Sequence, residues 1–258
     1  MNFITSLRSE ILKTKRTSSV WISLLGALFI PSIFLIMYLT RPDKLVPRLM
    51  MAPWQIHFSQ GWQGMNSFLF PMYIILICAL IPQIEFKNNA WKQVFASPQS
   101  TAQVYFAKFL TVHLMILFFY ALFVAFMLMT GVVSDLANSK YTFLERRVPW
   151  SVLMQLNAKT YISILGISAI QFWLSLRFKS FVGPVGIGLA LLVGGTIATG
   201  FGWEHVSKIP YAHPILTLMS MKDKGPLQLE NHELNSIGYF IFFTALGYWD
   251  LRTRKERG

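Results

Sequence analysis

Hydrophobic runs of membrane-spanning length recur along the chain, and polar segments separate them. A bilayer core about 30 Å thick needs roughly 20 apolar residues in a helix, a length that several of these runs approach. We predict spans at residues 20–39, 68–84, 104–130, 161–176, 181–200 and 236–249. The pattern therefore predicts an all-α, polytopic membrane protein with six transmembrane helices in a single transmembrane domain, residues 1–258.

The N-terminal residues 1–19 predict an amphipathic helix that lies in the plane of the lipid headgroups. Their apolar side chains share one helical stripe, and their basic side chains lie elsewhere. The stripe consists of Phe3, Ile4, Leu7, Ile11 and Leu12. Residues 41–67, rich in proline, tryptophan and glycine, are predicted as a loop with Trp54 and Trp62 at the membrane interface.

Composition and charge support a membrane location. Hydrophobic residues make up 54% of the chain and charged residues only 13%, although the net charge is +12. The basic residues are scattered among apolar spans and form no basic block with interleaved aromatic residues, so no nucleic-acid partner is expected. More than half of the 23 lysines and arginines fall on the side that carries both termini. The excess of positive charge predicts that both termini lie in the cytoplasm. The basic residues are also expected to contact anionic lipid of the bilayer.

The polar segment between the second and third spans predicts a short amphipathic helix at residues 85–97. Phe86, Ala90 and Val94 recur at a spacing of four, as do Trp91 and Phe95, so one flank of such a helix is apolar. Ser97 and Pro98 are expected to stop this helix and to begin the next one, with Ser97 as N-cap. The segment offers either a surface for a cytosolic protein or an ordinary interfacial loop.

Two charged residues at the edges of this segment have alternative roles. Glu85 either pairs with a base of a cytosolic partner or only stabilises its own helix. Lys108, one turn into the third span, either reaches back to the headgroups or pairs with Glu85. The single cysteine, Cys78, lies in an apolar run and is interpreted as a small apolar filler.

Small residues repeat every four positions in the fifth span, at Gly186, Ala190, Gly194 and Ala198. Such a face lets a second helix approach closely, and that helix belongs either to another protomer or to the same chain. His113 and Gln171 are polar residues inside predicted spans. They either line a substrate path or form hydrogen bonds between helices.

No cofactor or metal is expected in this chain. The external residues His57, Glu204, His205, His213, His232 and Glu233 match no metal-binding spacing. The sequence contains no G-x-x-x-x-G-K-[ST] motif, which predicts that the chain does not hydrolyse ATP, and it has no G-x-S-x-G or H-E-x-x-H motif. It is therefore predicted not to be an enzyme.

The layout resembles the membrane subunit of type-2 ABC transporters, and within them the bacitracin-resistance and lantibiotic-immunity permeases. The motif-level resemblance covers residues 7–22 and 85–108. Its residues in the second stretch are Glu85, Trp91, Lys92, Ser97, Pro98, Tyr105 and Lys108. The family often has an arginine soon after this proline, and residues 99–101 supply none, so an arginine-based partner contact is not carried over.

The resemblance implies that residues 85–97 form a coupling helix that docks on a separate ATP-binding subunit. Trp91 and Phe95 would enter a groove of that subunit, and Glu85 and Lys92 would add charge pairing. The implied site residues for this coupling are Glu85, Trp91, Lys92, Val94, Phe95 and Pro98. ATP and Mg²⁺ would be bound by the partner, and two permeases, identical or different, would work with two ATP-binding subunits.

The expected function is that of a permease subunit of an ATP-driven exporter in the bacterial cytoplasmic membrane. Few charges line the spans, which favours an amphipathic or lipid-like substrate or a peptide. The alternatives are a membrane-embedded lipid-modifying enzyme and a membrane scaffold without transport. Short helices outside the membrane are expected within residues 201–235.

Overall fold

Every regular element in the described residues of the computed structural model is a helix. The structure describes residues 2–15, 17–87, 90–96, 98–220 and 228–253, without the side chains of residues 92, 95 and 96. The long elements are α1 (Phe3–Thr14), α2 (Ser18–Thr40), α4 (Pro53–Gly64), α5 (Phe70–Lys87), α7 (Thr101–Ala137), α8 (Trp150–Arg177), α9 (Val182–Gly200) and α11 (Asn231–Thr253). The short ones are α3 (Pro42–Leu49), α6 (Trp91–Ala96), α10 (His213–Ser220) and the turns η1 (Met65–Leu69), η2 (Ser139–Tyr141), η3 (Val206–Lys208) and η4 (Pro210–Ala212).

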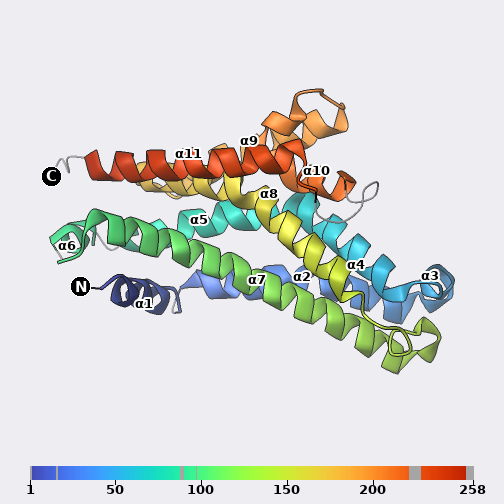
Figure 1. Ribbon diagram of the computed structural model, residues 1–258. Coiled ribbons are helices and arrows are strands. Elements are labelled where there is room, and N and C mark those ends of the chain that lie inside the picture. The colour runs from blue at the N-terminus through green and yellow to red at the C-terminus, as the bar shows by residue number, and fades with distance from the viewer. Residues whose placement is uncertain (1, 16, 88–89, 97, 221–227, 254–258) are drawn as a thin grey trace.

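The long helices form two side-by-side pairs joined by a central helix. Helix α2 packs along α7, and α11 packs along α8 (Figure 1). Helix α5 contacts α2, α7, α8 and α9. Both chain ends and α6 lie at one end of the bundle, and α3 lies at the other. The termini therefore share one end of the molecule; that this end faces the cytoplasm stays a prediction.

Four helical segments of the described chain are long and apolar enough to cross a membrane. They are Ser18–Thr40, Pro53–Lys87, Thr101–Ala137 and Val182–Gly200. Helices α8 and α11 cover the predicted spans 161–176 and 236–249 and have 28 and 23 residues. They are long enough to cross, but they contain more polar residues. The number of six crossings therefore stays a prediction.

The predicted loop at residues 41–67 is wrong, because the structure is helical there. Pro42 and Pro53 open α3 and α4, where the missing N–H of proline costs nothing. Helix α4 continues through the π-helical turn η1 into α5. Residues 53–87 therefore form one long helical segment, although proline and glycine in the sequence suggested breaks.

Trp54 and Trp62, which were predicted at the membrane interface, are buried at 3% and 0% exposure, so neither ring faces outward to lipid; their level in the membrane stays a prediction. The indole of Trp54 donates a hydrogen bond to the carbonyl of Phe143 at 2.9 Å. The Trp62 ring meets Phe123 edge-on, with centroids 4.9 Å apart. A Cβ at Gly131 would lie 2.6 Å from the Trp54 ring, so this glycine makes room for the indole.

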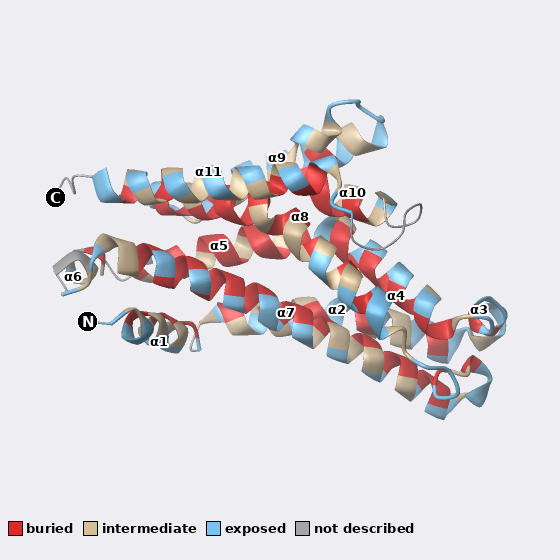
Figure 2. Ribbon diagram, viewed as in Figure 1, coloured by how far each residue is buried: buried red, intermediate tan, exposed pale blue. Residues whose placement is uncertain are grey.

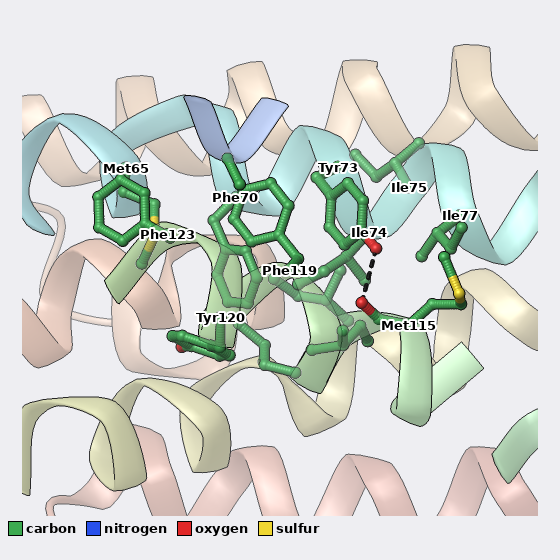
Figure 3. Close-up of a cluster of buried hydrophobic side chains, with 14 of the residues drawn as sticks. Met65, Phe70, Tyr73, Ile74, Ile75, Ile77, Met115, Phe119, Tyr120 and Phe123 are labelled. Carbon is green, nitrogen blue, oxygen red and sulfur yellow. Dashed lines mark hydrogen bonds between the residues drawn. The ribbon is translucent and has the colours of Figure 1, made fainter. Parts of the chain in front are cut away.

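Aromatic side chains of α5 and α7 fill the centre of the bundle (Figure 3). The Phe119 ring stacks on Tyr73 and Phe70, with centroids 4.3 and 5.4 Å away. The Tyr73 hydroxyl donates to the carbonyl of Met115 at 2.9 Å and also hydrogen bonds with Ser23. Buried residues cover the inner faces of the long helices (Figure 2). This packing fixes α5 and α7, which flank α6.

The region between α9 and α11 contains short helices, as expected for residues 201–235. Turns η3 and η4 lead into α10, whose His213, Pro214 and Thr217 are buried. Helix α8 begins at Trp150, before the predicted span 161–176, and continues without interruption to Arg177.

Candidate functional site

The segment predicted as one helix at 85–97 is divided in the structure. Glu85 belongs to α5, which ends at Lys87, and α6 begins at Trp91. The backbone N–H of Ala90 donates to the carbonyl of Glu85 at 2.9 Å, so the chain turns closely after α5. The single helix was therefore a wrong prediction, whereas a short separate helix between the two long ones is present.

Helix α7 begins at a different cap from the one predicted. The Ser100 hydroxyl accepts from the backbone N–H of Gln103 at 3.2 Å, and the Gln103 side chain accepts from the N–H of Ser100 at 3.0 Å. This reciprocal capping box satisfies two N–H groups at the helix end. Pro98 precedes the helix, so a start at Ser97 and Pro98 was wrong; Ser97 itself lies outside the described residues.

Trp91 faces the bundle. It is 9% exposed, its ring centroid lies 5.3 Å from that of Phe86, and the Lys108 ammonium lies 5.7 Å from it. Val94 is half-buried against the core. In this conformation Trp91 anchors α6 instead of projecting toward a partner, because the apolar flank of α6 finds its contacts within the chain. The side chains of Lys92 and Phe95 lie outside the described part.

Four charged side chains meet beneath α6, and we call them the ionic cluster: Glu10 and Lys13 of α1, Glu85 of α5 and Lys108 of α7. The Lys108 Nζ lies 2.7 Å from both Glu10 Oε2 and Glu85 Oε1. The Lys13 Nζ lies 2.6 Å from Glu10 Oε1 and 2.9 Å from Glu85 Oε1. The cluster thus joins three helices that are distant in sequence.

The ionic cluster is electrically balanced and almost dry. Glu85 and Lys108 are each 1% exposed. Burial by itself would raise the pKa of Glu10, but the charges and hydrogen bonds of Lys108 and Lys13 outweigh it and lower that pKa. Burial would lower the pKa of Lys13, but Glu10 and Glu85 outweigh it and raise that pKa. Glu10 and Lys13 are therefore held in their charged forms.

A cavity of about 340 Å³ adjoins the ionic cluster between α1, α5 and α6. Its described lining residues are Glu10, Lys13, Ile84, Glu85, Ala90, Gln93, Val94 and Gln99. The Oε2 atom of Glu85 is buried without a hydrogen-bond partner among the described residues. One carboxylate oxygen of a residue that lines the cavity is therefore buried and unsatisfied, at the end of the bundle that carries both termini.

The pair of Lys108 with Glu85 was one of the two alternatives predicted for Lys108, and it is present. Glu10 and Lys13 were missed because they lie 98 and 72 residues from their partners in the chain. One signal was available: Glu10 is the only acidic residue in the first 19, in a stretch that is otherwise basic.

The small residues of α9 lie mostly on its outer surface. Gly186, Ala190 and Gly194 are exposed and Ala198 is half-buried. A Cβ at Gly186 or Gly194 would meet nothing within 4 Å. The inner face is a different set: Pro184, Gly188, Leu192 and Gly195. The outer stripe is therefore not used for close packing within this chain.

Gln171 and His113 form hydrogen bonds between helices. The Gln171 amide donates to the carbonyl of Pro184 at 2.7 Å and accepts from the Tyr211 hydroxyl at 2.9 Å. The Nδ1 atom of His113 hydrogen bonds with the Tyr161 hydroxyl at 2.9 Å. The Nε2 atom of His113 has no partner among the described residues. A substrate path past these residues stays a prediction.

The histidines do not gather into a metal-binding set within the described residues, where no group of three potential ligands occurs. His57 lies inside the bundle, between the Tyr38 hydroxyl at 2.8 Å and the Met127 carbonyl at 2.9 Å. The rings of His213 and His232 are 6.0 Å apart. Each of the three is used in packing between elements.

These features define a multi-pass membrane protein whose short helix between two spans is tied to the bundle by buried charges. Residues 6–195 match the model of the ABC-2 family transporter protein, and the chain belongs to this family. No curated protein and no solved structure matches the chain. The protein is thus a permease component of an ABC transporter. Permeases of this family have no catalytic activity themselves and work with ATP-binding subunits, which excludes the lipid-modifying enzyme.

Proposed function

We propose that this chain is the permease subunit of an ATP-driven exporter of the bacitracin-resistance and lantibiotic-immunity kind, located in the bacterial cytoplasmic membrane. Two permeases, identical or different, work with two copies of the ATP-binding subunit, which bind ATP and Mg²⁺. The substrate is an amphipathic or lipid-like molecule or a peptide. The observation that carries this proposal is the fixed attachment of α6 to the ionic cluster beneath it.

The ionic cluster is suited to transmit a displacement of α6 into the bundle. The Trp91 ring contacts Lys108, and Lys108 pairs with Glu85 of α5 and Glu10 of α1. A partner that pushes on α6 therefore moves three helices together, since ion pairs of the cluster join each of the three to the others. Glu85 acts from inside the bundle in this proposal, and its free oxygen can receive a basic group of the ATP-binding subunit.

The second permease packs on the outer stripe of α9 in this proposal. Gly186, Ala190 and Gly194 are exposed and would let a partner helix approach closely. Movement of α6 changes the relation between the two permeases and alternates access to the substrate path. Of the two residues predicted to line the substrate path, His113 is the better candidate. Both polar side-chain atoms of Gln171 already form hydrogen bonds within the chain.

The test is to replace Trp91 by alanine in the permease co-purified with its ATP-binding subunit. Trp91→Ala removes the ring that joins α6 to Lys108, so stimulation of ATP hydrolysis by the permease should fall by about tenfold, which corresponds to roughly 1.4 kcal/mol of lost coupling. Trp150→Ala is the control, because Trp150 is 51% exposed where α8 begins, away from α6.

Normal stimulation in Trp91→Ala, with both subunits still co-purifying, would contradict the proposed coupling. Loss of co-purification with intact stability would show that α6 serves attachment, which is the scaffold alternative. The Trp150→Ala control should behave as the unmodified protein in both measurements.

A further inference from the structure

A second cavity, of about 400 Å³, lies between α4, α8 and α10. Helices α4 and α10 and the beginning of α8 lie away from the end of the bundle that carries both termini and α6 (Figure 1). The described lining residues are Gln55, Phe58, Ser59, Gln63, Ser67, Pro149, Val152, Leu153, Leu156, Ile215, Leu218 and Met219. We call this space the outer cavity. It shares no residue with the ionic cluster.

One wall of the outer cavity is a ladder of polar side chains. Gln55, Ser59, Gln63 and Ser67 follow one another every four residues along α4 and η1, so they share one face over about 18 Å. The Ser67 hydroxyl donates to the carbonyl of Gln63 at 2.6 Å. The side chains of Gln55, Ser59 and Gln63 form no hydrogen bond within the described residues and are exposed in the cavity.

The opposite wall is apolar. Leu153 and Leu156 of α8 are 3% and 7% exposed, and Ile215 and Leu218 of α10 complete the wall. Not one described residue that lines the cavity is ionisable. A charged ligand would therefore be desolvated there without a counter-charge, which is costly. The walls instead match a molecule with uncharged hydrogen-bonding groups along one side and hydrocarbon along the other.

The cavity is open at the surface of the bundle. Val152 and Met219 at its rim are 43% and 54% exposed. Its ladder lies in the polar N-terminal part of the helical segment Pro53–Lys87, directly before the predicted span 68–84. A cavity of this volume is within the usual range for small-molecule sites. A ligand can thus enter from the membrane surface beside the predicted spans 68–84 and 161–176.

We infer that the outer cavity binds a neutral, single-chain amphipath, with its hydroxyl, ester or amide groups on the Gln55–Ser59–Gln63 ladder and its hydrocarbon chain against α8 and α10. The site is separate from the coupling of α6 to ATP hydrolysis. It is occupied in the permease alone.

The experiment uses the full chain in phosphatidylcholine nanodiscs without the ATP-binding subunit. The probe is a monoacylglycerol with a diazirine in its chain, compared with the corresponding fatty acid and alkylammonium. Peptides that carry the photolabel are identified by mass spectrometry. The neutral probe should label α4, α8 and α10 at the cavity several-fold more than either charged probe.

Matched variants on α4 decide whether the ladder holds the ligand. The double variant Gln55→Leu/Gln63→Leu should lower labelling by about thirtyfold, because two hydrogen bonds of roughly 1 kcal/mol each are lost. Gln60→Leu should leave labelling unchanged, because Gln60 is exposed on the same helix but does not line the cavity. Ser59→Phe, which fills the cavity, should also abolish labelling.

Two results would overturn the inference: labelling spread evenly over lipid-facing helices, or equal labelling by neutral and charged probes. Unchanged labelling in Gln55→Leu/Gln63→Leu would overturn it as well. In a further arm, the ATP-binding subunit and ATP are added. A change in labelling identifies the ligand as a transported molecule, and constant labelling identifies it as a bilayer lipid; both keep the site.

Discussion

Lys108 is the residue on which the end of the bundle near both termini depends. Its ammonium is 1% exposed, pairs with Glu10 and Glu85, and lies over the Trp91 ring. A lysine in such a place is stable only with its partners, since an unpaired buried charge is strongly unfavourable. Its role thus follows from three helices at once and cannot be deduced from α7 alone.

Replacing Lys108 by methionine should destabilise the protein by about 3 kcal/mol, because Glu10 and Glu85 would be left with Lys13 alone. Thermal unfolding of the purified permease measures this loss. Lys87→Met is the control, since Lys87 at the end of α5 is exposed, and its Tm should stay within error. A Lys108→Met variant as stable as the control would show that the cluster contributes no net stability.

The attachment of α1 should depend on pH through two groups. The pKa of Glu10 is lowered below 4.5, so its contribution is present above pH 4.5 and disappears as the pH falls through the lowered value. The pKa of Lys13 is raised above 10.5, so its contribution is present below pH 10.5 and disappears as the pH rises through the raised value.

Unfolding measured against pH checks this expectation. The Tm of the unmodified chain should fall below pH 4.5, and the difference from Glu10→Gln should shrink in the same range. A constant difference down to pH 2 would contradict the role of Glu10.

At the residue scale, the sequence indicated which charged residues are important more readily than it indicated which residues pair with them. Glu85 and Lys108 stood out because charges are rare at the edges of apolar runs. Glu10 was not assigned to them, because pairing across 98 residues depends on tertiary packing and leaves no local pattern. Trp91 was recognised as important, but its direction was wrong: an apolar flank in sequence does not distinguish contact with a partner from contact with the chain itself.

Helix α9 has an inner face that is packed against neighbouring elements and an outer face that is open. Its inner face approaches neighbouring elements closely: a Cβ at Gly188 would lie 2.7 Å from the Gln171 side chain and 2.9 Å from Ile75. Its outer face, at Gly186 and Gly194, has no neighbour within 4 Å of such a Cβ. Both faces contain glycine, and only the structure separates them.

Matched glycine substitutions should distinguish the two faces. Gly188→Leu should destabilise the permease by several kcal/mol, because the inner face has no room for a side chain. Gly194→Leu should leave the Tm of the monomer unchanged but weaken association of the two permeases, measured by cross-linking in the membrane. Unchanged association in Gly194→Leu would remove this face from the proposed permease interface.

At the element scale, long apolar runs predicted the helices well. Proline and glycine residues were poor predictors of where a helix is interrupted. Runs such as 104–130 and 181–200 correspond to α7 and α9. Residues 41–67 were predicted as a loop because proline and glycine are frequent there. In the structure Pro42 and Pro53 begin helices, and Gly61 packs against Met127 and Phe123, so these residues serve helix starts and close contacts.

The whole molecule has two cavities at different levels of one bundle. The cavity beside the ionic cluster is lined by charged and polar groups near both termini, whereas the outer cavity has no ionisable lining. The central α5 lies between them and is held by the aromatic core. A partner that uses ATP and a ligand of the outer cavity would thus meet different parts of the same bundle.

The sidedness of the bundle can be tested with single cysteines in a Cys78→Ala background. Ser151→Cys at the start of α8 should react with a membrane-impermeant maleimide in intact cells. Thr253→Cys at the end of α11 should react only after lysis, because the termini are predicted to be cytoplasmic. The reverse pattern would place α6 outside, and no ATP-binding subunit could then reach it.

The π-helical turn η1 determines how insertions and deletions are tolerated along this chain. A π turn carries one residue more than an α turn, and removing a residue rotates a helix by about 100°. Within η1, however, loss of one residue would convert the π turn into an α turn, so α4 would keep its orientation with Trp54 and Trp62 buried, whereas a further inserted residue would rotate α4 relative to α5. A one-codon deletion should therefore be accepted at η1 and a one-codon insertion rejected there, so loss and gain of a residue would have opposite outcomes at the same place in the chain.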